Sequence, residues 1–144
     1  MSQPVVLFLC TGNSARSQMA EAFLRQYAGT QFESHSAGTD PKGVNPLTTQ
    51  VMQEVGIDIS GQRSKHLKEY LGRIPVRYLI TVCDNAAESC PTVWQGVAER
   101  FKWTFEDPAA CSGSNEERLA KFRQVRDEIE QQIKDWLGEV VGDF

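Results

Sequence analysis

Apolar residues along this chain form short continuous runs that alternate with stretches of helical spacing. Residues 5–9 and 78–82 are apolar almost without interruption, which is typical of strands buried on both faces of a parallel sheet. Residues 32–37 form a weaker run, for which we expect a short strand. Across residues 101–105 aromatic and polar residues alternate, and this predicts a strand with one polar face at the edge of the sheet.

Between these runs, apolar residues recur every three or four positions. The spacing predicts helices over residues 17–27, over residues 45–56 with Asn45 as N-cap, and over residues 116–137. A further short helix is expected around residues 67–71. Strands separated by helices in this order predict an open parallel α/β sheet with right-handed crossovers.

Length and composition narrow the class of protein. A chain of 144 residues with 40% hydrophobic and 24% charged residues predicts one globular domain over residues 1–144. A formal charge of −4 argues against nucleic acid as a partner but is compatible with a small, locally positive anion site. No stretch approaches the roughly 20 apolar residues that span a bilayer. We therefore expect a cytoplasmic protein without membrane contact, whose cysteines are reduced.

The segment between the first strand and the first helix carries a candidate nucleophile and an anion clamp. Residues 10–17 read Cys-Thr-Gly-Asn-Ser-Ala-Arg-Ser, and a loop that leads into a helix can turn its backbone N–H groups toward an anion. The arginine offers a planar fork for two oxygens of a tetrahedral oxyanion. The helix N-terminus and the final serine hydroxyl favour the thiolate of the cysteine. We predict Cys10 as nucleophile and an oxyanion-binding set of Thr11, Gly12, Asn13, Ser14, Ala15, Arg16 and Ser17.

The segment also has an alternative interpretation in which its residues have only structural roles. Taken alone, Cys10 is compatible with a buried apolar residue at a strand end, and Arg16 with a solvated helix residue. The buried strand before the loop, the Gly-Asn pair that tolerates positive φ and the helix start after it favour the functional interpretation.

These residues resemble the phosphate loop shared by low-molecular-weight protein tyrosine phosphatases and the arsenate reductases built on the same fold. The similarity covers nearly the whole chain, through residues 10–21, 36–38, 44–46, 55–60 and 106–108. The resemblance implies an α/β, flavodoxin-like fold, an open four-stranded parallel sheet flanked by helices. It also implies that Asp107, in an Asp-Pro pair, is the general acid.

Phosphatase and reductase activity differ in what they require. A phosphatase needs Cys10, Arg16 and Asp107, whereas a reductase must also find two electrons, and the sequence has no nicotinamide or flavin fingerprint. Cys83 and Cys90 have a spacing that resembles the redox pair of thioredoxin-coupled arsenate reductases. The residues after the Asp-Pro pair are Ala-Ala-Cys, where the phosphatases carry tyrosines. The sequence thus favours arsenate reduction.

The resemblance implies a relay of disulfides in which no cofactor takes part. A Cys10–Cys83 disulfide forms as arsenite leaves, a Cys83–Cys90 disulfide replaces it, and thioredoxin reduces that bond. Three alternatives remain: a protein tyrosine phosphatase, a reductase coupled to glutaredoxin and glutathione, and an oxyanion-binding or redox-regulatory module without turnover. A zinc site is disfavoured, because the two cysteines are too far apart for a knuckle and His35 and His66 show no ligand pattern.

Positions 15, 65 and 111 depart from the family pattern. Position 15 is Ala15, where many relatives carry a second loop cysteine, so a disulfide inside the loop is excluded. Some related reductases bind potassium behind the loop; here Lys65 takes the position of an acidic ligand, and we expect its ammonium to lie beside Glu21 in the cation's place, with no metal required. Cys111 has no assigned role. We expect a monomer, since no exposed apolar stripe remains.

Overall fold

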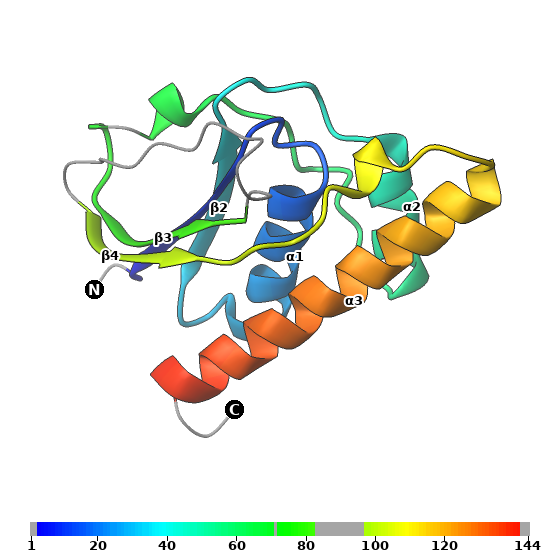
Figure 1. Ribbon diagram of the computed structural model, residues 1–144. Coiled ribbons are helices and arrows are strands. Elements are labelled where there is room, and N and C mark those ends of the chain that lie inside the picture. Colours follow the sequence, from blue (N-terminus) through cyan, green and yellow to red (C-terminus); the bar gives the residue numbers. More distant parts are fainter. Residues whose placement is uncertain (1–2, 71, 83–96, 142–144) are drawn as a thin grey trace.

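The computed structural model describes residues 3–70, 72–82 and 97–141. In chain order the elements are β1 (Val5–Cys10), α1 (Arg16–Ala28), β2 (Glu33–Gly38), α2 (Pro46–Glu54), the 3₁₀ helix η1 (Leu67–Glu69), β3 (Val76–Thr81), β4 (Val97–Lys102), the 3₁₀ helix η2 (Pro108–Ala110) and α3 (Asn115–Val140) (Figure 1). Within the described ranges the four strands form one parallel sheet in the order β2-β1-β3-β4. The predicted fold class is confirmed.

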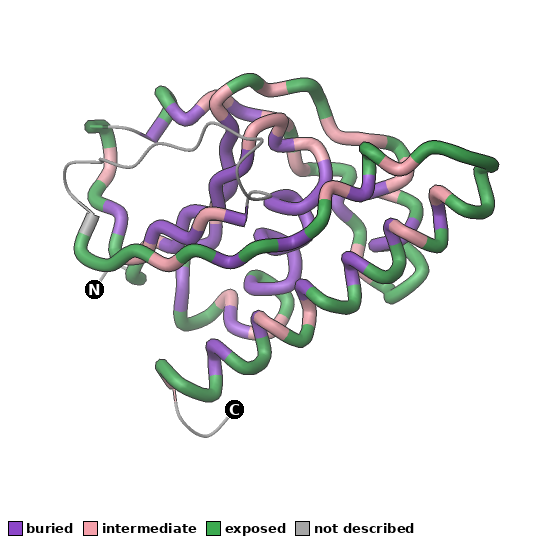
Figure 2. The backbone as a smooth tube through the Cα atoms, viewed as in Figure 1, coloured by how far each residue is buried: buried purple, intermediate pink, exposed green. Residues whose placement is uncertain are grey.

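The central strand β1 is apolar throughout because both of its faces are covered. Val6 and Phe8 point toward the side where α1 and α3 pack, whereas Leu7 and Leu9 join a second cluster on the opposite face. That second cluster includes residues of η1 and the turn after it. Figure 2 shows buried positions along the central strands and, alternating with exposed ones, along α3. This explains why residues 5–9 lack the alternation of a strand with one solvated face.

The order of the strands creates a switch point at the carboxyl ends of β1 and β3. The chain leaves β1 toward β2 on one side and later returns to β3 on the other side of β1. In open α/β sheets, ligands bind beyond the carboxyl ends of the strands at such a point. The loop of residues 10–15, which follows β1, lies there.

The fourth strand differs in its boundaries from the prediction. The aromatic alternation placed it at residues 101–105, but β4 ends at Lys102. Trp103 and Phe105 are nevertheless buried while Thr104 is exposed, and the Trp103 N–H donates to the carbonyl of Thr81 at 2.8 Å. The alternation therefore marks an extended segment with one buried side that runs on past the sheet. Its place at the edge of the sheet is confirmed.

Helix α2 begins where the sequence predicted, with Asn45 as its N-cap. The Asn45 side chain accepts a hydrogen bond from the N–H of Leu47 at 2.9 Å, and Pro46 is the first residue of α2. The final helix begins one residue before the predicted start, because Ser114 and Glu117 form a capping box. No helix within the described ranges is long and apolar enough to cross a membrane.

Candidate functional site: a loop of inward-facing amides

The loop after β1 has all its carbonyl oxygens engaged on its outer side. Backbone N–H groups of a bracing segment, residues 39–48, donate to four of these carbonyls at distances of 2.9–3.3 Å: Thr39 to Cys10, Asp40 to Thr11, Lys42 to Gly12 and Asn45 to Ser14. The Asn13 carbonyl accepts from the Gln18 side chain at 3.1 Å and the Ala15 carbonyl from the Met19 N–H at 2.9 Å. Carbonyls 10–15 are thus all occupied.

This arrangement decides where the amides of the loop point. In a trans peptide the N–H lies opposite the preceding carbonyl, and the described residues contain no cis peptide bond. The N–H groups of residues 11–16 therefore face the concave side of the loop. The N–H of Asn13 donates to Cys10 Sγ at 3.2 Å, which places the sulfur inside this ring of donors. Such a nest of amides at a helix N-terminus binds anions.

The Cys10 thiol is buried, with a relative exposure of 3%, and it has two hydrogen-bonding neighbours. Besides the Asn13 amide, the Ser17 hydroxyl lies 2.8 Å from the sulfur. The Asn13 side chain donates to that hydroxyl oxygen at 2.8 Å, which fixes the hydroxyl beside the sulfur. Ser17 thus contacts the predicted nucleophile through its side chain.

Arg16 and Asp107, which are far apart in the sequence, meet above the loop. The Arg16 guanidinium is buried and donates through Nη1 to the Phe105 carbonyl at 3.2 Å. Its Nη2 lies 3.8 Å from Oδ2 of Asp107. The Asp107 side chain is 36% exposed and accepts a hydrogen bond from the Ala109 N–H at 3.0 Å. The predicted clamp and the predicted acid are therefore neighbours.

A cavity of about 510 Å³ opens over these groups. Of the residues predicted from the sequence, seven line it: Cys10, Thr11, Gly12, Ser14, Ala15, Arg16 and Asp107. Its described walls also include Lys42, Val44 and Ala109 but no aromatic residue. Asn13 and Ser17, the other members of the predicted oxyanion-binding set, do not line the cavity, and both are buried.

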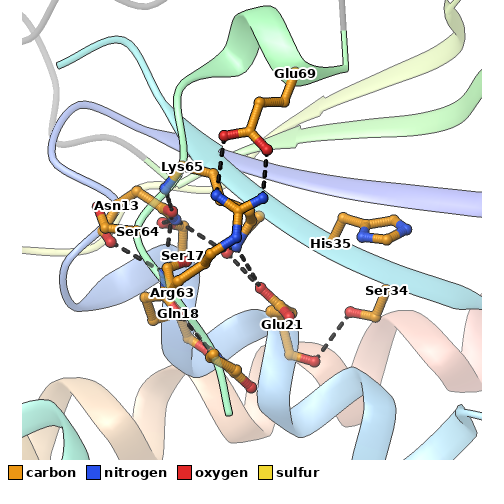
Figure 3. Close-up of polar contacts among 12 residues, drawn as sticks. Asn13, Ser17, Gln18, Glu21, Ser34, His35, Arg63, Ser64, Lys65 and Glu69 are labelled. Carbon is orange, nitrogen blue, oxygen red and sulfur yellow. Dashed lines mark hydrogen bonds and ion pairs between the residues drawn. The ribbon is translucent and has the colours of Figure 1, made fainter. Parts of the chain in front are cut away.

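The side chain of Asn13 instead holds the back of the loop together. Its φ angle is +47°, in the left-handed region that asparagine tolerates. The amide donates to Ser17 and to Ser36, the latter at 3.0 Å. The carbonyl oxygen accepts from the Lys65 N–H at 2.8 Å and from Gln18 Nε2 at 3.0 Å. Figure 3 shows these contacts converging on Asn13.

Further behind the loop, the Lys65 ammonium lies beside Glu21, as expected from the sequence. The Glu21 carboxylate is buried and accepts from Ser36 Oγ and from Arg25 Nη2, both at 2.5 Å. Lys65 Nζ lies 3.7 Å from Glu21 Oε1 and donates to the Arg63 carbonyl at 2.7 Å (Figure 3). Burial lowers the pKa of Lys65, while the charge of Glu21 acts in the opposite direction. The ammonium of Lys65 occupies the space beside Glu21, so the residues present do not fit a potassium ion there.

Gly38 and Gln18 support the loop but were not singled out in the sequence. A Cβ on Gly38 would lie 2.4 Å from the Thr11 carbonyl oxygen and 3.0 Å from the Asn13 nitrogen, so β2 can approach the loop only with glycine there. Gln18 is fully buried and donates to the Arg63 carbonyl at 2.9 Å as well as to Asn13. The helical spacing gave no signal for Gln18, because it places this residue on the side of the predicted helix opposite the apolar residues.

The remaining candidates divide into those that the structure places and those that it does not. Cys83 and Cys90 lie outside the described residues. Cys111 is partly buried and does not line the cavity. His35 contacts Glu33 at 2.7 Å, and His66 accepts from the Lys68 N–H at 3.1 Å. Across residues 3–70, 72–82 and 97–141 no group of three or more potential ligands is arranged to hold a metal ion.

Comparison with known proteins identifies the family. The sequence profile of the low molecular weight phosphotyrosine protein phosphatases matches residues 5–143. The chain belongs to this family. Among similar proteins, an arsenate reductase of Halalkalibacterium halodurans is 45% identical over 134 residues, which cover 93% of this chain and 95% of that protein.

Solved structures of this family agree with the fold described above. An arsenate reductase in the phosphate-binding state has a TM-score of 0.80 and 30% identity, and the match covers 96% of this chain and 99% of that one. The thioredoxin-dependent arsenate reductase of Corynebacterium glutamicum has a TM-score of 0.73 and 28% identity, over 96% of this chain and 62% of that one.

Proposed function

We propose that this chain is an arsenate reductase, which reduces arsenate to arsenite with electrons from its own cysteines. The observation that carries the proposal is the ring of inward-facing amides around the Cys10 sulfur, with Arg16 above it. Such a site accepts a tetrahedral oxyanion and presents a nucleophile to its central atom. The arsenate reductase names of relatives at 45% identity favour arsenic as that atom.

The first chemical step joins sulfur to arsenic. The Cys10 thiolate attacks arsenate held by the loop amides and Arg16, a sulfur–arsenic bond forms, and one oxygen leaves as water. Asp107 supplies the proton for that oxygen. This role is supported by the position of the carboxyl group, which lines the cavity and lies beside Arg16.

Two further thiols supply and remove the electron pair. The Cys83 thiolate attacks the Cys10 sulfur, and the electrons of the sulfur–arsenic bond pass to arsenic, which leaves as arsenite. Cys90 then attacks Cys83, which frees Cys10 and leaves a Cys83–Cys90 disulfide. Reduced thioredoxin resets that disulfide by thiol exchange, an assignment supported by the name of the Corynebacterium glutamicum neighbour. Glutaredoxin with glutathione is the alternative reductant.

A second candidate function is hydrolysis of phosphotyrosine. The family profile favours it, and Cys10, Arg16 and Asp107 would suffice for it. Among the described residues, the cavity wall after Asp107 carries Ala109 rather than an aromatic side chain, so this part of the wall gives a phenyl ring little to pack against. We therefore place phosphatase activity second, as a weak side activity.

The cellular setting follows from the same relay. Three thiols that must start each cycle reduced require a reducing compartment, so we place the protein in the cytoplasm. We further propose that residues 1–144 act as a single domain and as a monomer, with an oxyanion and thioredoxin as partners and neither nucleic acid nor membrane. No bound cofactor takes part in the proposed chemistry.

Arsenite production with thioredoxin, thioredoxin reductase and NADPH tests the proposal. Cys10→Ser, Cys83→Ser and Cys90→Ser should each abolish multiple turnover, whereas the matched variant Cys111→Ser should retain it. Activity that survives in both Cys83→Ser and Cys90→Ser would discard the relay. Activity with glutaredoxin and glutathione in place of thioredoxin would discard the assigned reductant. A wild-type protein that hydrolyses an aryl phosphate but makes no arsenite would be a phosphatase.

A further inference from the structure

The rim of the cavity carries a second cation that the chemistry above does not use. Lys42 lines the cavity together with Arg16. These two are the cations in the described lining, and Asp107 is its anion. The Arg16 side chain is buried, and its Nη2 already lies 3.8 Å from Asp107 Oδ2. Lys42 is 65% exposed, so its charge is the one that an incoming ion meets first.

The backbone of Lys42 is fixed to the loop. Its N–H donates to the Gly12 carbonyl at 2.9 Å. Its side-chain stem lies across Gly12, with Cγ 3.3 Å from where a Cβ on that glycine would stand. A long lysine side chain anchored at its base keeps its ammonium within a short radius of the cavity mouth.

At rest the Lys42 ammonium is held by a neighbour. Lys42 Nζ lies 2.8 Å from Asp40 Oδ2, and both side chains are about two-thirds exposed. Asp40 is itself anchored through its N–H to the Thr11 carbonyl at 2.9 Å, and Pro41 stiffens the link between the two. Ion pairs this exposed contribute little to stability. The lysine is therefore free to exchange Asp40 for another anion at small cost.

The charges explain why such a group is useful. The protein has a formal charge of −4, which repels a dianion at long range, and the buried arginine is partly neutralised by Asp107. Cations at the mouth of a cleft raise the local concentration of an oppositely charged substrate and its association rate. Arsenous acid, in contrast, is uncharged at neutral pH, so the same cation does not hold the product.

We propose that Lys42 is the substrate-capture residue of this site: it releases Asp40, takes up a doubly charged tetrahedral oxyanion at the rim and passes it to the loop amides and Arg16. This inference rests on the proposed function for the identity of the oxyanion. Asp40 acts as the competing anion that sets how readily Lys42 is available. The pair thus tunes capture without contributing to the bond-making steps.

Steady-state kinetics with arsenate at low ionic strength tests this role. Lys42→Gln should raise KM about fivefold and leave kcat within about twofold. Asp40→Asn should lower KM, because it frees the lysine. Lys134→Gln is the matched control: it removes a paired, partly exposed lysine on α3 that does not line the cavity, and should change KM by less than about 1.5-fold. At about 0.5 M salt the Lys42 effect should fall below twofold.

A second readout separates this inference from the reductase assignment. Alkylation of Cys10, followed by mass spectrometry of its peptide, compares anionic iodoacetate with neutral iodoacetamide. The ratio of the two rates should fall severalfold in Lys42→Gln, rise in Asp40→Asn and stay constant in Lys134→Gln. If the protein makes no arsenite, the proposed function fails, while this ratio still decides the capture role. A Lys42→Gln protein that matches Lys134→Gln in the ratio overturns the inference, as does an Asp40→Asn protein that attracts iodoacetate less than the wild type.

Discussion

The two sides of the loop at residues 10–15 differ in which backbone groups they present. On the concave side, amide N–H groups and the Arg16 fork face a cavity of about 510 Å³. On the convex side, every carbonyl from Cys10 to Ala15 has a donor, and Asn13, Gln18 and Glu21 are buried with partners. The concave side, which we call the open side, provides binding and chemistry. The convex side, which we call the closed side, holds the amides in position. Hydrogen-bond donors that are held in position in this way need not reorganise when a negatively charged oxyanion binds.

We expect the largest loss of stability and turnover from a substitution at Gly38, where β2 contacts the convex side of the loop. In Gly38→Ala the new methyl group would meet the Thr11 carbonyl oxygen at 2.4 Å, so either β2 or the loop must shift. We expect a loss of about 2–4 kcal/mol in the free energy of unfolding. A displacement of about 1 Å in the amides should lower arsenate turnover about a hundredfold.

Gly61→Ala provides the matched control for this substitution. Nothing lies within 4 Å of a Cβ at Gly61, so stability should change by less than about 0.5 kcal/mol and turnover should be unaffected. Denaturant unfolding and arsenite production measure both variants. Equal effects of the two glycine substitutions would show that the contact between β2 and the loop does not hold the amides.

A smaller effect is expected from Lys65, deeper in the closed side. Lys65→Met removes the ammonium beside buried Glu21, which keeps Ser36 and Arg25 as partners. We expect a loss of about 1–3 kcal/mol in stability and a smaller loss of turnover than in Gly38→Ala. Lys68→Met, at an exposed lysine of η1, should be close to neutral.

The dependence of turnover on potassium and of stability on pH provides two further tests of the role of Lys65. Because its ammonium fills the cation's place, wild-type turnover should not respond to potassium, and activation of severalfold would contradict the assignment. The lowered pKa of Lys65 means that the unfolded chain binds this proton more tightly. Its contribution to stability should therefore rise with pH between the lowered value and the ordinary 10.5, and the difference between wild type and Lys65→Met should grow over that window.

The open side could be predicted from the sequence to a greater extent than the closed side. Cys10 and Arg16 belong to one short segment after an apolar strand, so local spacing was enough to find them. Asp107 required the family resemblance, because its contact with Arg16 depends on where the fold brings the segment after β4. The bracing hydrogen bonds come mainly from backbone N–H groups of residues 39–45. Every residue type except proline carries that donor, and no sequence pattern reveals where it points.

Asn13 illustrates the same limit inside the loop. Its place in the segment put it in the oxyanion-binding set, and its N–H faces the Cys10 sulfur, but its side chain turns to Ser17 and Ser36 on the closed side. The Ser17 hydroxyl was expected beside the Cys10 sulfur and lies 2.8 Å from it. The Lys65 contact with Glu21 was predicted correctly, because it depended on one position in a known family pattern. Position along the chain therefore located the site, but the direction of each side chain required the fold.

The proposed function requires that the amides of residues 11–16 bind a tetrahedral oxyanion. Amide-proton NMR spectra, recorded while the reduced protein is titrated with inorganic phosphate, report on this binding. We expect saturable downfield shifts of these amides, with the amides of the last turns of α3 unchanged as an internal reference. The same titration of Gly38→Ala should give much smaller shifts at equal phosphate. Loop amides that do not respond in the wild type would show that the loop does not bind the oxyanion.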